Sequence, residues 1–144
     1  MTTGVLAEHD LTADLVAGFH LEALEVSGGT VGMPRARVVV SSAGGDKAEA
    51  AAEGNGMIDA ACTAIRSATK VESRLIGFNV SSVTGGVDAL GDVVVQLEAE
   101  GLKVSGRGVS TDVVEASARA YLAAVNRLVR IRARNEERAV EIGP

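Results

Sequence analysis

The sequence is poor in aromatic residues and in cysteine, and both shortages limit what it can encode. Among its 144 residues there is no Trp, and the aromatic residues are Phe19, Phe78 and Tyr121. Ala and Val supply most of the apolar side chains, so we expect a core of small, closely packed groups. The single cysteine, Cys62, cannot form an internal disulfide, which is typical of proteins from a reducing compartment.

Positive charge and long apolar runs are also scarce. The net charge of -5 argues against a general nucleic-acid binder, which is normally basic. The arginine-rich stretch 127–138 contains acidic residues and no aromatic side chain for base stacking, so we interpret it as a solvated helix end. No apolar run reaches the roughly 20 residues that span a bilayer, and Met1–Asp10 does not resemble a secretory signal. We therefore expect a cytoplasmic protein with neither a nucleic-acid nor a membrane partner.

The chain contains two copies of one pattern. Residues 21–29 (LEALEVSGG) and 78–86 (FNVSSVTGG) alternate loosely and end in a glycine pair. Each is followed by a Val-rich segment, by a turn with glycine, and by a Gly-x-Gly motif that precedes an apolar helical stretch. The sequence therefore predicts a duplicated unit of three strands and one helix.

From this duplication we predict an α+β fold with two βββα units, each a three-stranded antiparallel sheet covered by a helix. Residues 47–54 are helix formers by composition, but their counterpart 102–108 has the pattern of a strand, so we predict strands in both places. The helices should run over about 57–69 and from about Thr111, capped by Ser110 or Thr111, into the 130s. One helix covers only one face of a three-stranded sheet. We therefore expect a homodimer, in which a second copy of the chain covers part of the other face.

The predicted domain organisation follows the repeat. We predict that residues 19–131 form one domain, made of a first unit at 19–70 and a second unit at 71–131. Residues 1–18 form a leader with a short helix at about Leu11–Gly18, and residues 132–144 form a frayed C-terminal tail.

The Gly-x-Gly motifs have three possible roles. A phosphate-binding loop would need a third glycine, or Lys followed by Ser or Thr, and neither copy has them. The glycines could simply allow a sharp turn from strand to helix. A free amino acid fits the chemistry better: helix N–H groups suit its carboxylate, Asp59 or Asp88 suits its ammonium, and Ile58 and Leu90 suit a branched aliphatic side chain.

Other chemistries have little support in the sequence. His9 and His20 are the only histidines and have no placed carboxylate, so we predict no metal site. No arrangement of nucleophile and base can be assembled, and Cys62 lies among alanines as a small core residue would. We predict no catalytic residues and no cofactor.

The motifs GNGMIDAACTAI, VSSVTGGVDALGDVVVQL and GRGVSTDVVEASARAYLAAVNRL, in this order, resemble the C-terminal allosteric domain of 2-isopropylmalate synthase and citramalate synthase. The resemblance covers about Phe19 to Val129. It implies two βββα units, a homodimer, and binding of an end product, leucine or isoleucine respectively, that inhibits a separate catalytic barrel condensing acetyl-CoA with a 2-oxo acid. That barrel of eight βα units needs metal ligands and many more residues than this chain contains. We therefore predict that the chain is not an enzyme by itself.

The resemblance also implies a ligand site, drawn from the first glycine loop, the strand after the first helix and the TGGxDALG loop. Its residues are Gly54, Asn55, Gly56, Ile58, Asp59, Leu75, Gly77, Phe78, Ser81, Asp88, Ala89 and Leu90. Two positions depart from the family pattern, because Met57 replaces a usual Pro and Phe78 a usual Tyr. We expect leucine as the ligand and a synthase catalytic domain as a partner; an isoleucine sensor and a ligand-free dimerisation module are the alternatives.

Overall fold

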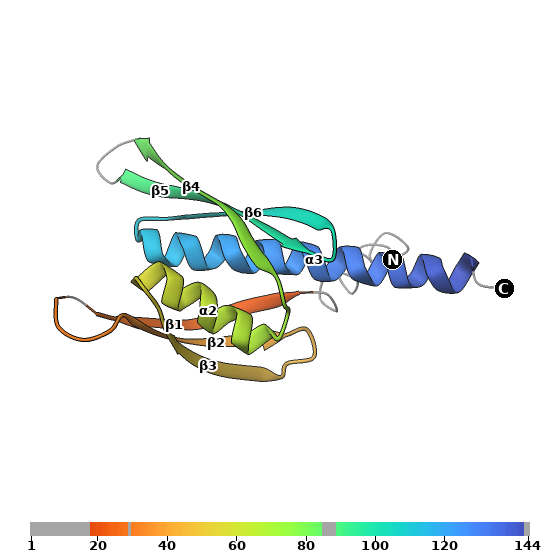
Figure 1. The fold of residues 1–144 in the computed structure, drawn as a ribbon, viewed down its shortest axis with the longest axis horizontal. Coiled ribbons are helices and arrows are strands. Elements are labelled where there is room, and N and C mark those ends of the chain that lie inside the picture. Colours follow the sequence, from red (N-terminus) through yellow and green to blue (C-terminus); the bar gives the residue numbers. More distant parts are fainter. Residues whose placement is uncertain (1–17, 29, 85–88, 143–144) are drawn as a thin grey trace, which may run out of the picture.

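The computed structural model describes residues 18–28, 30–84 and 89–142, and it contains two consecutive βββα units (Figure 1). The first unit comprises β1 (Phe19–Ser27), β2 (Arg35–Ser42), β3 (Lys47–Glu53) and α2 (Met57–Thr69). The second comprises β4 (Arg74–Thr84), β5 (Ala89–Ala99), β6 (Leu102–Ser110) and α3 (Val113–Ile142). The short helix predicted near Leu11–Gly18 lies almost wholly outside the described residues.

Each unit forms its own antiparallel sheet, in the order β1-β2-β3 and β4-β5-β6, as the repeat predicts. The Ala- and Glu-rich segment Lys47–Glu53 is a strand, so tertiary pairing overrides its helical propensity. Val38 of β2 lies between Leu24 and Ala50, and Val95 of β5 lies between Phe78 and Gly106. These two rows fix the structural correspondence between the units.

The two helices lie between the two sheets (Figure 1). Most residues of α3 between Ala116 and Val125 are therefore buried, among them Ser117, Tyr121 and Leu122, and Arg119 lies on the one exposed side. The outer sheet faces are polar: Arg107 pairs with Asp92 at 2.7 Å, and Arg74 with Glu98 at 2.8 Å. These ion pairs make the outer faces suited to water, while Leu90 and Val109 add some exposed apolar surface to the outer face of the second sheet.

The glycines of the second Gly-x-Gly motif do not form a loop before the helix, which corrects that interpretation of the motif and confirms the strand predicted at 102–108. Gly106 and Gly108 lie inside β6, directly under α3. A Cβ atom on Gly106 would lie 2.2 Å from the carbonyl oxygen of Ala120, and one on Gly108 would lie 2.2 Å from that of Ala116. Glycine is therefore required here so that the helix can approach the strand closely.

Helix α3 starts two residues after the predicted point and is capped by Asp112, not by Ser110 or Thr111. The Asp112 carbonyl accepts the first helical hydrogen bond, from the Ala116 N–H at 2.9 Å. At its other end α3 reaches Ile142 and so includes most of the predicted tail at 132–144. The sequence from Val113 to Ile142 has no Gly or Pro and is rich in Ala, Arg and Glu, which favour helix.

Candidate functional site

The starts of α2 and α3 occupy equivalent places in the repeat and differ in chemistry. Counted from the matched strand rows, Gly56 corresponds to Asp112, and Asp59 corresponds to Glu115. The first helical residues, Met57 and Val113, are both 39% exposed. The two helix starts can therefore be compared position by position.

At the start of α2 the N-cap residue is Gly56, in an extended conformation that any residue can adopt. Glycine has no side chain to accept hydrogen bonds from the first-turn N–H groups, and none caps the helix here. A Cβ atom added to Gly56 would meet nothing within 4 Å. Among the described residues, the positive end of the α2 dipole is therefore not met by a side-chain cap.

The preceding loop is held against this helix start. The Asp59 Oδ2 atom accepts a hydrogen bond from the Asn55 N–H at 3.0 Å. A Cβ atom on Gly54 would lie 2.5 Å from that same oxygen and 2.6 Å from the Ala60 nitrogen. Only glycine therefore fits at position 54 without movement of the loop or the helix. The structure thus brings together four of the predicted site residues: Gly54, Asn55, Gly56 and Asp59.

At the start of α3, the protein's own side chains accept hydrogen bonds from the first-turn N–H groups. Asp112 Oδ1 accepts hydrogen bonds from the N–H groups of Val114, at 2.8 Å, and Glu115, at 3.4 Å. The Ser110 hydroxyl donates to Glu115 Oε2 at 2.6 Å, and Arg119 pairs with Glu115 at 3.1 Å. The Ser110 hydrogen bond, followed by the Arg119 contacts, lowers the pKa of the Glu115 carboxyl. This helix start needs no ligand to satisfy it.

Strand β4 supplies an apolar surface with the predicted residues Leu75 and Phe78. Phe78 pairs with buried Val95 and Leu75 with buried Leu97, so both side chains lie on the helix-facing side of the sheet. They nevertheless remain 40% and 45% exposed. Their counterparts in β1, Leu21 and Leu24, are half-buried.

The remaining predicted residues are distributed differently. Ser81 pairs with Asp92, which forms an ion pair with Arg107 on the outer face, so Ser81 lies on the face opposite to Phe78. By strand alternation Leu90 shares the outer face with Asp92. Gly77 lies beside Gln96, where a Cβ atom would be 2.7 Å from Gln96 Oε1. Ala89 begins β5, and Asp88 lies outside the described residues.

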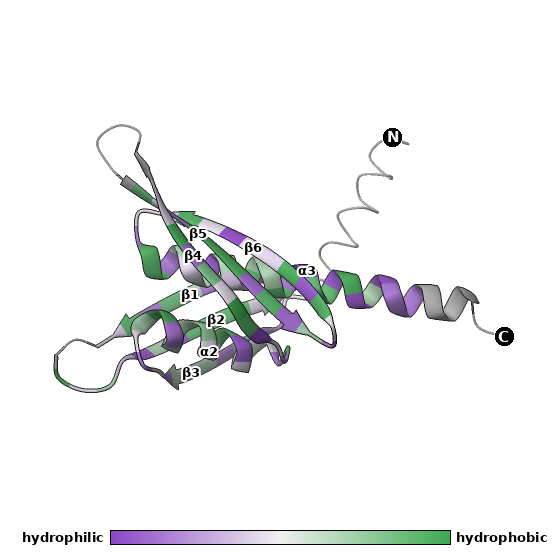
Figure 2. Ribbon diagram, turned by 45° about the horizontal axis from the view of Figure 1, so that its top comes forward, coloured by the Kyte–Doolittle hydropathy of each residue, from purple (hydrophilic) through white to green (hydrophobic). Residues whose placement is uncertain are grey.

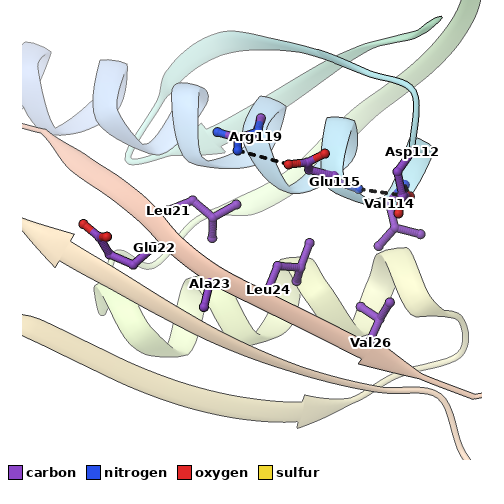
Figure 3. Close-up of a pocket in the computed structure, with 9 residues that line it drawn as sticks. All are labelled: Leu21, Glu22, Ala23, Leu24, Val26, Asp112, Val114, Glu115 and Arg119. Carbon is purple, nitrogen blue, oxygen red and sulfur yellow. Dashed lines mark hydrogen bonds and ion pairs between the residues drawn. The ribbon is translucent and has the colours of Figure 1, made fainter.

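A groove that the sequence did not indicate lies between β1 and the start of α3 (Figure 3). It has a cavity volume of about 210 Å³. Leu21 and Leu24 line one side, and Val114 and Glu115 line the other. It is the second-helix counterpart of the region between β4 and the start of α2. A correct alignment of the two units would have located this groove. The Gly-x-Gly motifs do not give that alignment, because they match position 54 with position 106, whereas the strand rows match position 50 with position 106.

The other candidate groups have ordinary environments. Cys62 is buried, and this burial raises the pKa of its thiol to about 12, so it is largely unreactive at neutral pH. Within the described ranges no three His, Cys, Asp or Glu side chains come together as metal ligands, and His9 lies outside those ranges. None of the described helices is long and apolar enough to cross a membrane.

Comparison with known proteins adds to this geometry. Residues 5–129 match the LeuA allosteric (dimerisation) domain. A 2-isopropylmalate synthase of Acidimicrobium ferrooxidans is 48% identical over 138 residues, which are 93% of this chain and 26% of that protein. That of Brevibacillus brevis is 47% identical over 111 residues, 77% of this chain and 22% of its own.

The chain thus spans about a quarter of the length of these relatives. The family match covers both of the antiparallel βββα units except for the end of α3. The chain therefore belongs to the LeuA allosteric (dimerisation) domain family.

Proposed function

We propose that this domain binds leucine between the start of α2 and β4, and that the bound leucine inhibits a synthase of the 2-isopropylmalate type. The observation that carries the proposal is the difference between the two equivalent helix starts. Asp112 occupies the N–H groups of α3, whereas Gly56 leaves those of α2 without a side-chain cap. Because a helix N-terminus attracts anions, a ligand carboxylate fits at α2 and is excluded at α3.

The surroundings suit the other parts of an amino acid. The Asp59 carboxylate lies in the first turn of α2, next to the place proposed for the ligand carboxylate, and is suited to receive the ammonium group. Ile58, half-buried, and the exposed apolar surfaces of Leu75 and Phe78 are suited to an aliphatic side chain. Because Phe78 has no hydroxyl, this wall of the site is apolar, and the ligand is selected by shape.

The regulatory role follows from the family. The relatives named 2-isopropylmalate synthase are about four times longer than the matched segment, so catalysis is proposed to reside in the part that this chain does not match, acting in the cytoplasm on leucine synthesis. Leucine would favour one arrangement of the regulatory domain and, through it, a less active state of the catalytic part. The chain by itself is not expected to turn over acetyl-CoA and a 2-oxo acid.

A thermal-shift titration with leucine, isoleucine and valine tests the proposal. Leucine at about 100-fold over its Kd should raise the melting temperature by on the order of 5–10 °C, because a ligand specific to the folded state stabilises it. A larger shift with isoleucine would instead indicate a sensor of the citramalate synthase type. If none of the three moves the melting temperature, the chain is a dimerisation module without a ligand, and the proposal is wrong.

A further inference from the structure

Strand β4 differs from the other sheet edges in its lack of charge. The strand orders leave four edge strands in the described part of the chain: β1, β3, β4 and β6. Charges lie within β1 at Glu22 and Glu25, within β3 at Glu49, and within β6 at Arg107. Interior charges of this kind prevent an edge from pairing with another chain. After Arg74, β4 has no charged residue through Thr84.

The same strand is long, apolar and exposed. It has 11 residues, and hydrophobic segments run along it (Figure 2). Ile76 and Val80 are 38% and 44% exposed, in addition to Leu75 and Phe78. The bulge at Ile76 is confined to one end, and residues 77–84 pair with β5 in unbroken register. The regular, uncharged part of this edge, residues 77–84, is a template for a further strand.

We propose that this edge is an interface between two copies of the chain, in which β4 pairs antiparallel with β4 of a second copy across a two-fold axis. The two sheets would then join into one sheet of six strands. A two-fold interface must be self-complementary, and antiparallel pairing of residues 77–84 brings no charged side chains together. The same pairing through β1 would place Glu22 and Glu25 close to their copies.

A second copy is the occupant that the observations favour. The matched family is described as a dimerisation domain, but that description does not say which surface pairs. The outer faces carry ion pairs, including Arg37 with Glu49 and Arg107 with Asp92, so they are suited to water. The unguarded backbone edge lies on β4. This inference does not depend on leucine binding, because pairing uses the backbone edge of β4 while the proposed ligand contacts its helix-facing side chains.

Sedimentation velocity over a concentration series, without ligand, tests the interface. The unmodified chain should dimerise. Asn79→Lys and Val80→Lys each place like charges across the two-fold and should weaken the dimer by on the order of tenfold or more. The matched control is Ser105→Lys on β6, the other edge of the same sheet, which should leave the dimer unchanged.

A cross-linking experiment locates the interface independently. Cysteines placed singly at positions 78–81 of β4 should form intermolecular disulfides under mild oxidation, with one position strongly preferred, and Ser105→Cys should not. Buried Cys62 should stay reduced in all of them. A monomer at all concentrations, a dimer unaffected by both lysine variants, equal weakening by Ser105→Lys, or cross-links favouring Ser105→Cys would overturn the proposal. Because these experiments contain no leucine, their outcome tests the β4 interface alone. Failure of the proposed leucine binding would be detected in the thermal-shift titration instead.

Discussion

Gly106 and Gly108 show at the residue scale how a motif can be correctly noticed and wrongly interpreted. Two glycines one residue apart before a helix suggest a loop. In the structure they lie inside β6 because α3 passes directly over them. The repeat favoured a strand over 102–108 and the Gly-x-Gly motif favoured a loop, and the structure agrees with the repeat. The close approach of α3 could not be predicted, since it depends on how the rest of the fold packs the helix.

Replacing Gly106 by Ala should therefore destabilise the protein. The new Cβ atom would lie 2.2 Å from the Ala120 carbonyl oxygen, and α3 would have to move away from β6. We expect a loss of roughly 1–3 kcal/mol in the free energy of unfolding, measured by urea denaturation. Gly44→Ala is the control, because a Cβ atom there meets nothing within 4 Å, and it should change stability by less than about 0.5 kcal/mol. Equal effects of the two substitutions would contradict the close-packing role.

The Glu115 carboxyl gives a prediction about pH. Its pKa is lowered from the ordinary value of 4.5 by the Ser110 hydrogen bond and by Arg119. The charged carboxylate is therefore stabilised in the folded state relative to the unfolded state. The resulting stabilisation is present above about pH 4.5 and is lost as the pH falls through the lower pKa of the folded state.

The variant Glu115→Gln lacks this titration. The difference in unfolding free energy between the unmodified chain and Glu115→Gln, measured with urea at several pH values, should be largest near neutral pH and should shrink below about pH 4.5. A difference that stays constant from pH 7 to pH 3 would contradict the assigned role of this carboxyl.

At the scale of elements, the duplication carried most of the fold prediction. It identified all six strands and both described helices, including β3, whose composition favours helix. It could not predict that both helices would lie between the two sheets, because that depends on how the two units pack on each other. It also misaligned the units at the Gly-x-Gly motifs, so the groove between β1 and α3 was missed.

One side chain joins an element of the first unit to an element of the second. The amide of Asn126 on α3 accepts a hydrogen bond from the Phe19 N–H at 2.7 Å and donates one to the Phe19 carbonyl oxygen at 3.0 Å. These two hydrogen bonds fix the first residue of β1 to the long helix.

Asn126→Ala should detach the start of β1. Two partly buried backbone groups would lose their partner, which should cost about 1–3 kcal/mol of stability and speed hydrogen exchange at the Phe19 amide. Asn135→Ala, at an exposed position further along α3, is the matched control and should change neither quantity appreciably. Unchanged hydrogen exchange at the Phe19 amide in Asn126→Ala would contradict the role of these two hydrogen bonds in holding the start of β1.

At the scale of the whole molecule, the domain is a duplicated structure whose two halves differ at the helix start where we propose that the ligand binds. The helix starts share their position and differ in their caps, Gly56 in the first half and Asp112 in the second. The sequence could predict Gly54, Asn55, Gly56 and Asp59 together because they are neighbours in the chain. The faces of β4 and β5, on which Ser81 and Leu90 lie, follow from strand register and were not predictable in the same way.

Isothermal titration calorimetry of leucine with three proteins tests the central claim most directly: the unmodified chain, Gly56→Asp and Asp112→Gly. Gly56→Asp copies the cap of the second half onto the first, into space that is open in the structure, so it should fold with unchanged or higher stability. We predict one leucine bound per chain for the unmodified protein and for Asp112→Gly, and no binding for Gly56→Asp. Unchanged affinity in Gly56→Asp, or loss of binding in Asp112→Gly alone, would contradict the claim that the uncapped start of α2 holds the ligand.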